Sequence, residues 1–299
     1  MAATSEPAWE PHTVVDEAVV DAGPLRAFQA LVDDGLPEVA SGDPLPPLWH
    51  WLALPAWSPS SMLGIDGHPR RGSFLPPIDL PRRMFAGGQV TLHAPIPIDA
   101  TVRREAEVTG VEHKRGRSGE LVVVRTRTRL FVASALCLEE RQDLIYRDAP
   151  TSPAEASAPV VQLPPPTEPA VPLRGTGAGE WVLHTDPTLL MRFSAATANA
   201  HRIHYDWPYA TGVEGYPGLV VHGPLMSLLL AETARLSGLV DIRRLAHRNL
   251  APLFCGEPAT LCLAEDPDSP GTQIARLVSA ETVRTSLSMA TGSRGRGTP

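Results

Sequence analysis

The chain has 299 residues, a formal net charge of −7 and three cysteines. The acidic balance excludes the surface-wide positive field of a nucleic-acid-binding protein, and cysteines without a CxxC pair indicate a reducing compartment. The first 17 residues lack the apolar core of a secretory signal, and no stretch approaches the roughly 18 apolar residues that span a bilayer. We therefore expect a soluble, cytoplasmic protein whose length allows one large core or two ordinary ones.

The first half is predicted to open with a strand and a helix and to continue with a tryptophan-rich helix. Residues 14–20 carry a strand-like pattern and residues 25–32 a helical one, before Asp33-Asp34-Gly35 stops the helix. Pro46-Pro47 directly precedes the segment 48–54, and proline suits the first turn of a helix. The tryptophans of this region predict a packed aromatic wall, with an aromatic ligand box as the alternative.

Strands dominate the rest of the first half. They follow a Gly- and Pro-rich loop at 64–81. One strand carries an arginine row on the side opposite its apolar residues, formed by Arg125, Arg127 and Arg129. We interpret this row as a solvated sheet face, with an anionic ligand as the alternative. The strands are predicted at 89–92, 101–111, 121–132 and 136–146.

The composition changes in the middle of the chain. Residues 149–178 are rich in Pro, Ala and Thr and have little to bury, which is typical of an extended linker. This pattern predicts a first domain at 1–148, a linker at 149–178 and a second domain at 179–299.

The second half repeats the order of a helix followed by strands. Asp186-Pro187 predicts a helix start, with Asp as the N-cap and Pro in the first turn. Residues 219–239 are apolar on nearly every side, so we expect a buried helix there. A buried helix followed by antiparallel strands predicts an α+β fold in which a sheet wraps around a helix, in two tandem copies. The last strands are predicted at 260–264, 273–279 and 283–289.

The densest polar cluster is Asn199-Ala-His-Arg-Ile-His204-Tyr-Asp206, and Gly218-Leu-Val-Val-His222-Gly223-Pro224 follows it at the start of the buried helix. Polar groups in this position are a common way to build an active site. His201, His204 and Asp206 could ligate a metal, but the sequence shows no further ligand. Gly87-Gly88 lacks the strand–helix setting of a dinucleotide-binding loop. We therefore predict neither a metal nor a cofactor.

This cluster carries a family resemblance. Phe193-Ser194, the 199–206 stretch and Gly215-Tyr-Pro-Gly-Leu-Val-Val-His-Gly223 closely resemble the type 2 hydroxyacyl-thioester dehydratases and the mesaconyl-CoA and itaconyl-CoA hydratases, which are MaoC-like hot-dog proteins. The family's pattern is similar to Asp-x-Asn-Pro-x-His-x-Asp, and its first aspartate falls on Asn199. In the first half, Leu80-Pro-Arg-Arg-Met-Phe-Ala-Gly-Gly88 resembles the N-terminal domain of the same proteins.

The resemblance implies a tandem (double) hot-dog fold, in which an antiparallel sheet wraps around a long central helix in each half. The first half is then a degenerate, structural copy whose groove helps to hold the acyl chain, and the second half is the catalytic one. Two such folds in one chain mimic the family's usual dimer, so a monomer and a homodimer of these chains both stay open.

The same resemblance implies reversible hydration of a 2-enoyl thioester or dehydration of a 3-hydroxyacyl thioester, most like a mesaconyl-CoA or itaconyl-CoA hydratase. His204 would carry the proton, Asn199 would hold the water or the hydroxyl, and Gly223 would donate its N–H to the enolate oxygen. A carrier-protein-linked dehydratase and a non-catalytic acyl-thioester-binding protein are the alternatives. Supporting roles are implied for Arg202, Tyr205, Asp206 and His222, with His201 as a structural neighbour.

Overall fold

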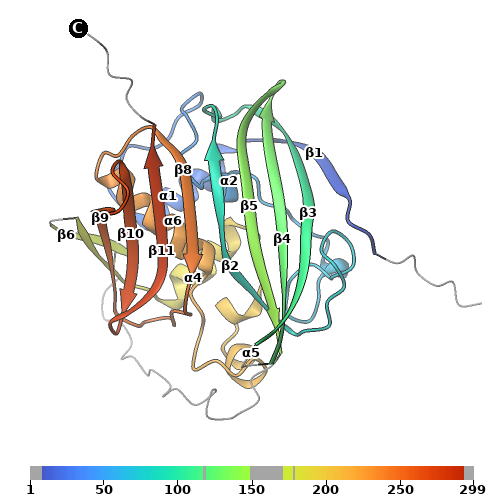
Figure 1. Cartoon of the computed structure of the whole chain (residues 1–299). Helices are drawn as coiled ribbons and strands as arrows, with labels where there is room; N and C mark the ends of the chain where they lie inside the picture. The colour runs from blue at the N-terminus through green and yellow to red at the C-terminus, as the bar shows by residue number, and fades with distance from the viewer. Residues whose placement is uncertain (1–8, 117–118, 149–170, 178, 293–299) are drawn as a thin grey trace, which may run out of the picture.

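The strands form a single antiparallel sheet. The computed structural model describes residues 9–116, 119–148, 171–177 and 179–292, and the sheet has eleven strands (Figure 1). Their order across the sheet is β1-β3-β4-β5-β2-β8-β11-β10-β9-β7-β6. The strands are β1 (Thr13–Val19), β2 (Arg82–Leu92), β3 (Thr101–Gly116), β4 (Gly119–Val132), β5 (Ala135–Arg147), β6 (Leu173–Gly177), β7 (Glu180–Leu183), β8 (Ile242–Asn249), β9 (Ala259–Glu265), β10 (Thr272–Ser279) and β11 (Thr282–Thr291).

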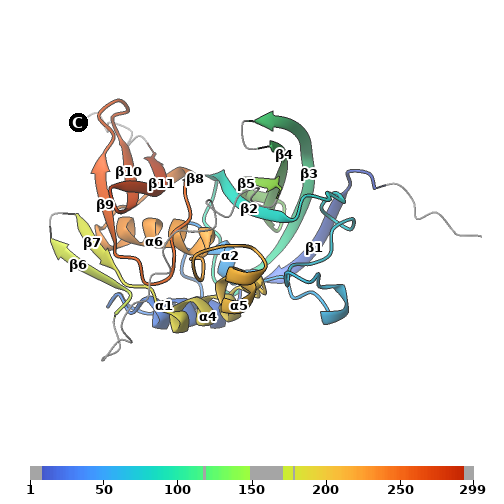
Figure 2. The same ribbon diagram turned by 90° about the horizontal axis from the view of Figure 1, so that it is seen from below.

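The helices cover one face of this sheet. Figure 2 shows α2 and α6 next to the sheet, and α1, α4 and α5 in a second layer beyond them. Within the described part of the chain, no helix is long and apolar enough to cross a membrane. The helices are α1 (Ala22–Val32), α2 (His50–Ala53), α4 (Pro187–Ala196), α5 (Trp207–Gly212) and α6 (Gly223–Leu236), with two 3-10 turns, η1 (Ser60–Met62) and η2 (Arg202–His204).

The two halves meet along β2 and β8, where Gly87 and Gly88 lie. Gly87 pairs with Arg248, and Gly88 pairs with His247. A Cβ on Gly88 would lie 2.2 Å from the Arg141 carbonyl oxygen, and a Cβ on Gly87 would lie 2.4 Å from the His247 carbonyl oxygen. Glycine is needed at both positions because any side chain would force these strands apart.

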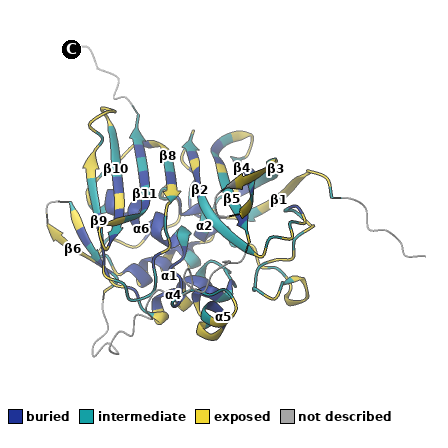
Figure 3. Ribbon diagram, turned by 60° about the horizontal axis from the view of Figure 1, so that its bottom comes forward, coloured by how far each residue is buried: buried dark blue, intermediate teal, exposed yellow. Residues whose placement is uncertain are grey.

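Helix α6 is the buried centre of the second half. It packs against β9, β10 and β11, and also against β2 of the first half. Figure 3 shows it buried along most of its length. The helix predicted at 219–239 begins at Gly223, because Pro224 favours a helix start and the preceding Val220 N–H donates to the Ile203 carbonyl at 3.0 Å instead of entering the helix.

The prediction of a long central helix in each half is wrong for the first half. Helix α6 has 14 residues, whereas α2 has four. The tryptophan-rich helix predicted at 48–54 stops early because Leu54 precedes Pro55, and proline disfavours the helical conformation at the residue before it. Trp49 is fully buried but Trp57 is 76% exposed, so the expected aromatic wall is incomplete.

Most of the predicted linker at 149–178 lies outside the described residues. Its described end contains β6, which pairs with β7 at the edge of the sheet. The domain boundaries at 148 and 179 therefore stay a prediction.

The arginine row on β4 faces carboxylates of the adjacent strands. Each of its cations has an acidic partner within 3 Å, at the partly exposed surface of the sheet. This pairing favours the predicted solvated face over a face that binds an anionic ligand. The pairs are Arg125 with Glu112 at 2.8 Å, Arg127 with Glu107 at 2.6 Å and Arg129 with Glu105 at 2.8 Å.

Candidate active site

His204 ends the turn η2 and is buried. Its Nδ1 lies 2.7 Å from the carbonyl oxygen of Val220. Because a carbonyl oxygen only accepts hydrogen bonds, Nδ1 carries the proton and Nε2 keeps its lone pair. Burial first, and the charge of His201 second, lower the pKa of His204 to about 3. His204 is therefore a neutral imidazole with an Nε2 that can accept a proton.

His222 holds the ring of His204 in place. The two rings stack with centroids 3.6 Å apart and planes inclined by 20°. Nε2 of His222 lies 2.8 Å from Oγ of Ser194, and its Nδ1 is buried without a partner among the described residues. Burial, and then the charge of His204, lower the pKa of His222 well below its usual value. Since His222 is also the N-cap of α6, the stacked pair joins the 199–206 motif to the start of that helix.

Gly223 is the first residue of α6, at the positive end of the helix dipole. The N–H groups of a first helical turn have no partner inside the helix, and Pro224 has no N–H at all. The His222 side chain makes no capping hydrogen bond that would cover this end. A Cβ on Gly223 would lie 3.0 Å from Nδ2 of Asn249 and 3.3 Å from the Phe85 ring, so only a very small residue fits here.

Asn199 follows α4, and its amide oxygen is already engaged. It accepts a hydrogen bond from the His201 N–H at 3.2 Å, which leaves the amide NH2 group as the available donor. The His201 ring lies 5.4 Å from that of His204, centroid to centroid. Its Nε2 lies 3.2 Å from Oε1 of Glu214. His201 is thus a hydrogen-bonded neighbour of the site.

The other predicted supporting residues brace the motif loop. Arg202 and Asp206 form an ion pair with a distance of 2.7 Å. Asp206 also caps α5 by accepting a hydrogen bond of 3.2 Å from its first turn. The Tyr205 hydroxyl donates to the Ala200 carbonyl at 2.8 Å. Arg202 also donates to the Ile65 carbonyl at 3.2 Å, which ties the motif loop to a loop of the first half.

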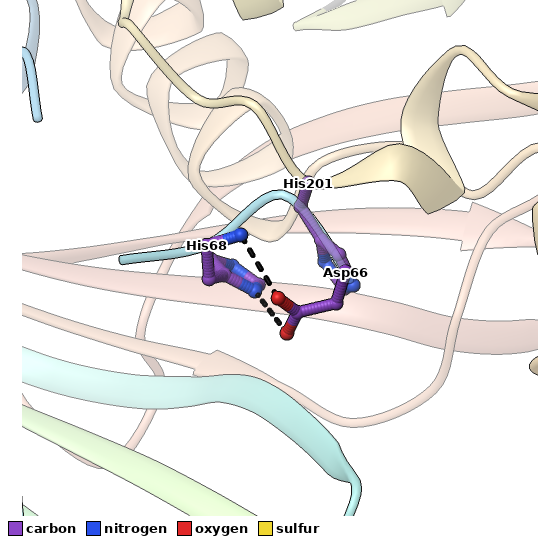
Figure 4. Close-up of side chains that lie close together, drawn as sticks. All are labelled: Asp66, His68 and His201. Carbon is purple, nitrogen blue, oxygen red and sulfur yellow. Dashed lines mark hydrogen bonds and ion pairs between the residues drawn. The ribbon is translucent and has the colours of Figure 1, made fainter. Parts of the chain in front are cut away.

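That first-half loop brings two side chains that the sequence pattern did not identify as functional. Figure 4 shows Asp66 and His68 facing His201. The rings of His68 and His201 have centroids 4.0 Å apart. Asp66 accepts hydrogen bonds of 3.0 Å from both the backbone N–H and Nδ1 of His68. The available signal was the length of the loop between α2 and β2, since long ordered loops are commonly functional.

Asp66, His68 and His201 also lie close enough to hold a cation, since one ligand atom of each lies within 4.8 Å of the others. The hydrogen bonds of His68 to Asp66 and of His201 to Glu214 already engage these atoms. Burial, and then the charge of Arg83, hold the pKa of His68 well below its usual value. The charge of Arg83 would also repel a cation bound here, which opposes a metal ion at this cluster.

Comparison with known proteins places this site in a family. The family described as hydroxyacyl-thioester dehydratase type 2 matches residues 48–255, which include the Asp66 loop and the whole 199–223 region. The chain belongs to this family. As a type 2 hydroxyacyl-thioester dehydratase family member, it is an enzyme of the hydratase and dehydratase class, as predicted.

The curated relatives of this family member include the mesaconyl-C(4)-CoA hydratase of Chloroflexus aurantiacus. That protein is 46% identical over 229 residues, which cover 75% of this chain and 76% of the relative. Among solved structures, HtdX of Mycobacterium tuberculosis has a TM-score of 0.63 at 18% identity and covers 95% of this chain and 100% of its own. Another M. tuberculosis protein, described as having a double hotdog fold, has a TM-score of 0.52 at 15% identity, with 96% and 97% covered. The predicted double hot-dog fold is thereby confirmed.

Proposed function

We propose that the protein catalyses reversible hydration of a CoA-linked 2-enoyl thioester and that mesaconyl-C4-CoA, or a similar dicarboxylic ester, is its substrate. The observation that carries the proposal is the neutral His204, which has an open Nε2 and is stacked on His222 beside Gly223. The identity of 46% to a mesaconyl-C(4)-CoA hydratase supports the CoA-linked substrate.

In this proposal His204 is the base that takes a proton from water. As the water oxygen bonds to the β-carbon, the proton passes to Nε2 and the electron pair of the double bond moves toward the thioester carbonyl. The NH2 group of Asn199 holds the water, since the amide oxygen is engaged with His201. Because burial keeps the pKa of His204 low, at about 3, the ring is neutral and able to accept a proton at neutral pH.

Gly223 then stabilises the enolate that this step creates. Negative charge develops on the thioester oxygen, and the Gly223 N–H at the start of α6 is a fixed donor for it. Such a donor contributes about 3 kcal/mol in other enzymes. The imidazolium of His204 returns its proton to the α-carbon, so that one water has been added and His204 is neutral again. His204 carries both proton transfers because the amide of Asn199 cannot exchange a proton usefully.

Dehydration of a carrier-protein-linked 3-hydroxyacyl thioester is the second candidate. The description of the matched family, hydroxyacyl-thioester dehydratase type 2, favours it. Dehydration is the reverse of the hydration steps above and would use the same three residues, His204, Asn199 and Gly223. The two candidates therefore differ in the acyl group and in the carrier of the thioester.

A substrate panel tests the proposal. The protein is mixed with mesaconyl-C4-CoA, with crotonyl-CoA and with a carrier-protein-linked crotonyl group, and the enoyl-thioester absorbance is followed. We expect both CoA esters to be hydrated, with the higher kcat/KM for mesaconyl-C4-CoA. A higher kcat/KM with the carrier-linked ester would select the second candidate. Binding of CoA esters without any change in absorbance would identify a non-catalytic thioester-binding protein.

A further inference from the structure

Arg83 is a partly buried cation without an acidic partner. It is the second residue of β2 and pairs across the sheet with Tyr146 of β5. Tyr146 is fully buried. Within the described part of the chain, Arg83 forms no ion pair. Desolvating a charge without an ion-pair partner is costly, so this arrangement is expected where an anion binds.

Several other arginines of the sheet and its loops differ from Arg83 because their guanidinium groups have partners. The arginine row on β4 is paired with glutamates of the neighbouring strand β3. Arg71, which lies over the Tyr146 ring at 4.9 Å, donates to backbone carbonyls that include that of Pro81 at 3.0 Å. Arg82, the residue before Arg83 on β2, likewise forms no ion pair among the described residues, but its guanidinium lies over the Tyr216 ring at 4.5 Å. The charge of Arg83 is therefore available to a ligand.

Arg83 and Phe85 are two residues apart on β2, so their side chains point to the same face of the sheet. The Phe85 ring on that face lies 3.3 Å from the Cβ position of Gly223. The charge of Arg83 also depresses the pKa of His68. From His68 the path to the proposed base is short. The His68 ring lies 4.0 Å from the His201 ring, which lies 5.4 Å from the His204 ring.

We propose that Arg83 binds a carboxylate carried by the acyl group and so selects dicarboxylic acyl thioesters. This inference rests on the proposed function and names the residue that would recognise its substrate. The carboxylate would replace the missing acidic partner of Arg83, and a guanidinium can bind it through two parallel hydrogen bonds.

A carboxylate anchored at this position would also orient the reacting carbon. In mesaconyl-C4-CoA the free carboxylate is attached to the β-carbon, which is the carbon that water attacks. An anchor on the carboxylate therefore fixes the β-carbon relative to His204 and to the water that Asn199 holds. Correct positioning of this kind can contribute as much to the rate as a chemical group does.

The test compares wild type with Arg83→Met on mesaconyl-C4-CoA and on crotonyl-CoA, which has the same CoA but no carboxylate on its acyl group. We expect kcat/KM for mesaconyl-C4-CoA to fall by roughly a hundredfold, and the ratio of the two kcat/KM values to shift toward crotonyl-CoA by at least about tenfold. Equal losses on both esters would overturn the inference and would indicate a contact to CoA or a structural role. An unchanged preference would overturn it as well.

Two further variants keep the result interpretable. Arg83→Lys retains the charge and is expected to recover part of the preference for mesaconyl-C4-CoA, which a purely structural residue would not do. Arg127→Met is the matched control, since that arginine is paired with Glu107 on the sheet surface, and it should leave the preference unchanged.

A binding measurement separates this inference from the proposed function. Free mesaconate is titrated into wild type and into Arg83→Met by calorimetry, which requires no turnover. If wild type binds mesaconate and Arg83→Met does not, but wild type hydrates none of the esters, the hydratase proposal is refuted and the anion site is kept. The opposite result is also possible: the protein hydrates crotonyl-CoA, but Arg83→Met changes neither the binding of mesaconate nor the preference between the two esters. That result would keep the hydratase proposal and refute the role of Arg83.

Discussion

Gly67 lies against the backbone of Ala200, so that a Cβ built on Gly67 would come within 1.8 Å of the Ala200 carbonyl oxygen. The φ of Gly67 is +87°, in the left-handed region that favours glycine. At this contact the loop of the first half docks on the motif loop of the second half, where the Arg202 N–H donates to the Asp66 carbonyl at 2.9 Å. The contact therefore determines where Asp66 and His68 lie.

Gly67→Ala should lower kcat/KM for mesaconyl-C4-CoA by roughly a hundredfold, because the added methyl group meets backbone atoms and the loop has to move. The fold should persist, since the loop is at the surface. Gly42→Ala is the matched control: Gly42 has a φ of +83° and nothing within 4 Å of its Cβ position. Gly42→Ala places an alanine at a positive φ without a clash against backbone atoms, so this variant should retain most of the activity. A Gly67→Ala enzyme with normal turnover would show that the loop is not part of the site.

His204→Ala should reduce turnover by roughly a hundredfold or more, because the proposed base and acid of both steps is lost. His204→Gln is the more conservative variant, since its amide can still donate toward the Val220 carbonyl but cannot transfer a proton. Circular dichroism and steady-state hydration measure the outcome. His12→Ala, at an exposed histidine, is the control. Substantial activity in folded His204→Gln would rule out His204 as the proton carrier.

Asn199→Asp should keep measurable activity. A carboxylate oxygen can still accept the hydrogen bond from the His201 N–H that Asn199 accepts now. Its negative charge would favour the imidazolium form of His204 and raise the pKa of that residue, so the acid limb of the kcat/KM profile should move to higher pH. The pH profile of hydration checks this shift. A folded but inactive Asn199→Asp would mean that the amide donor is essential, and Asn199→Ala would then be equally inactive.

Acidification should destabilise the fold between about pH 6.5 and pH 4. Burial lowers the pKa of His204 to about 3 and that of His247 to about 4, from 6.5. In this window the unfolded chain binds protons that the folded chain does not, so the free energy of unfolding falls as the pH falls. Each buried histidine contributes on the order of 1 kcal/mol per pH unit.

Urea denaturation at about pH 7.5 and about pH 5 measures this dependence. His247→Asn removes one of the buried imidazoles outside the proposed catalytic group and should reduce the difference between the two pH values. His12→Asn, at an exposed position, should leave the difference unchanged. If stability is the same at both pH values, the buried histidines do not behave as the structure requires.

Local sequence determined much of the second half. Alternating residues specified β9, β10 and β11 but not β8, which the sequence analysis did not predict. Asp186-Pro187 specified the start of α4, where Asp186 accepts from the Leu189 N–H at 2.7 Å. Asn199 and His204 lie in one short stretch, and Pro224 marks the helix start at Gly223. These features can be predicted from the sequence because each depends on interactions between residues that are close together in the chain. Both interacting residues are therefore present in the same short segment.

Tertiary structure decided what joins that motif to the first half. Asp66, His68 and Arg83 reach it through the docking of Gly67 on Ala200 and the pairing of β2 with β8, contacts between residues more than a hundred positions apart. The local pattern of residues cannot predict which distant carbonyl group a glycine will contact. The unpaired charge of Arg83 likewise depends on which side chains fold around it, so its difference from the arginine row on β4 becomes visible only when the sheet is assembled.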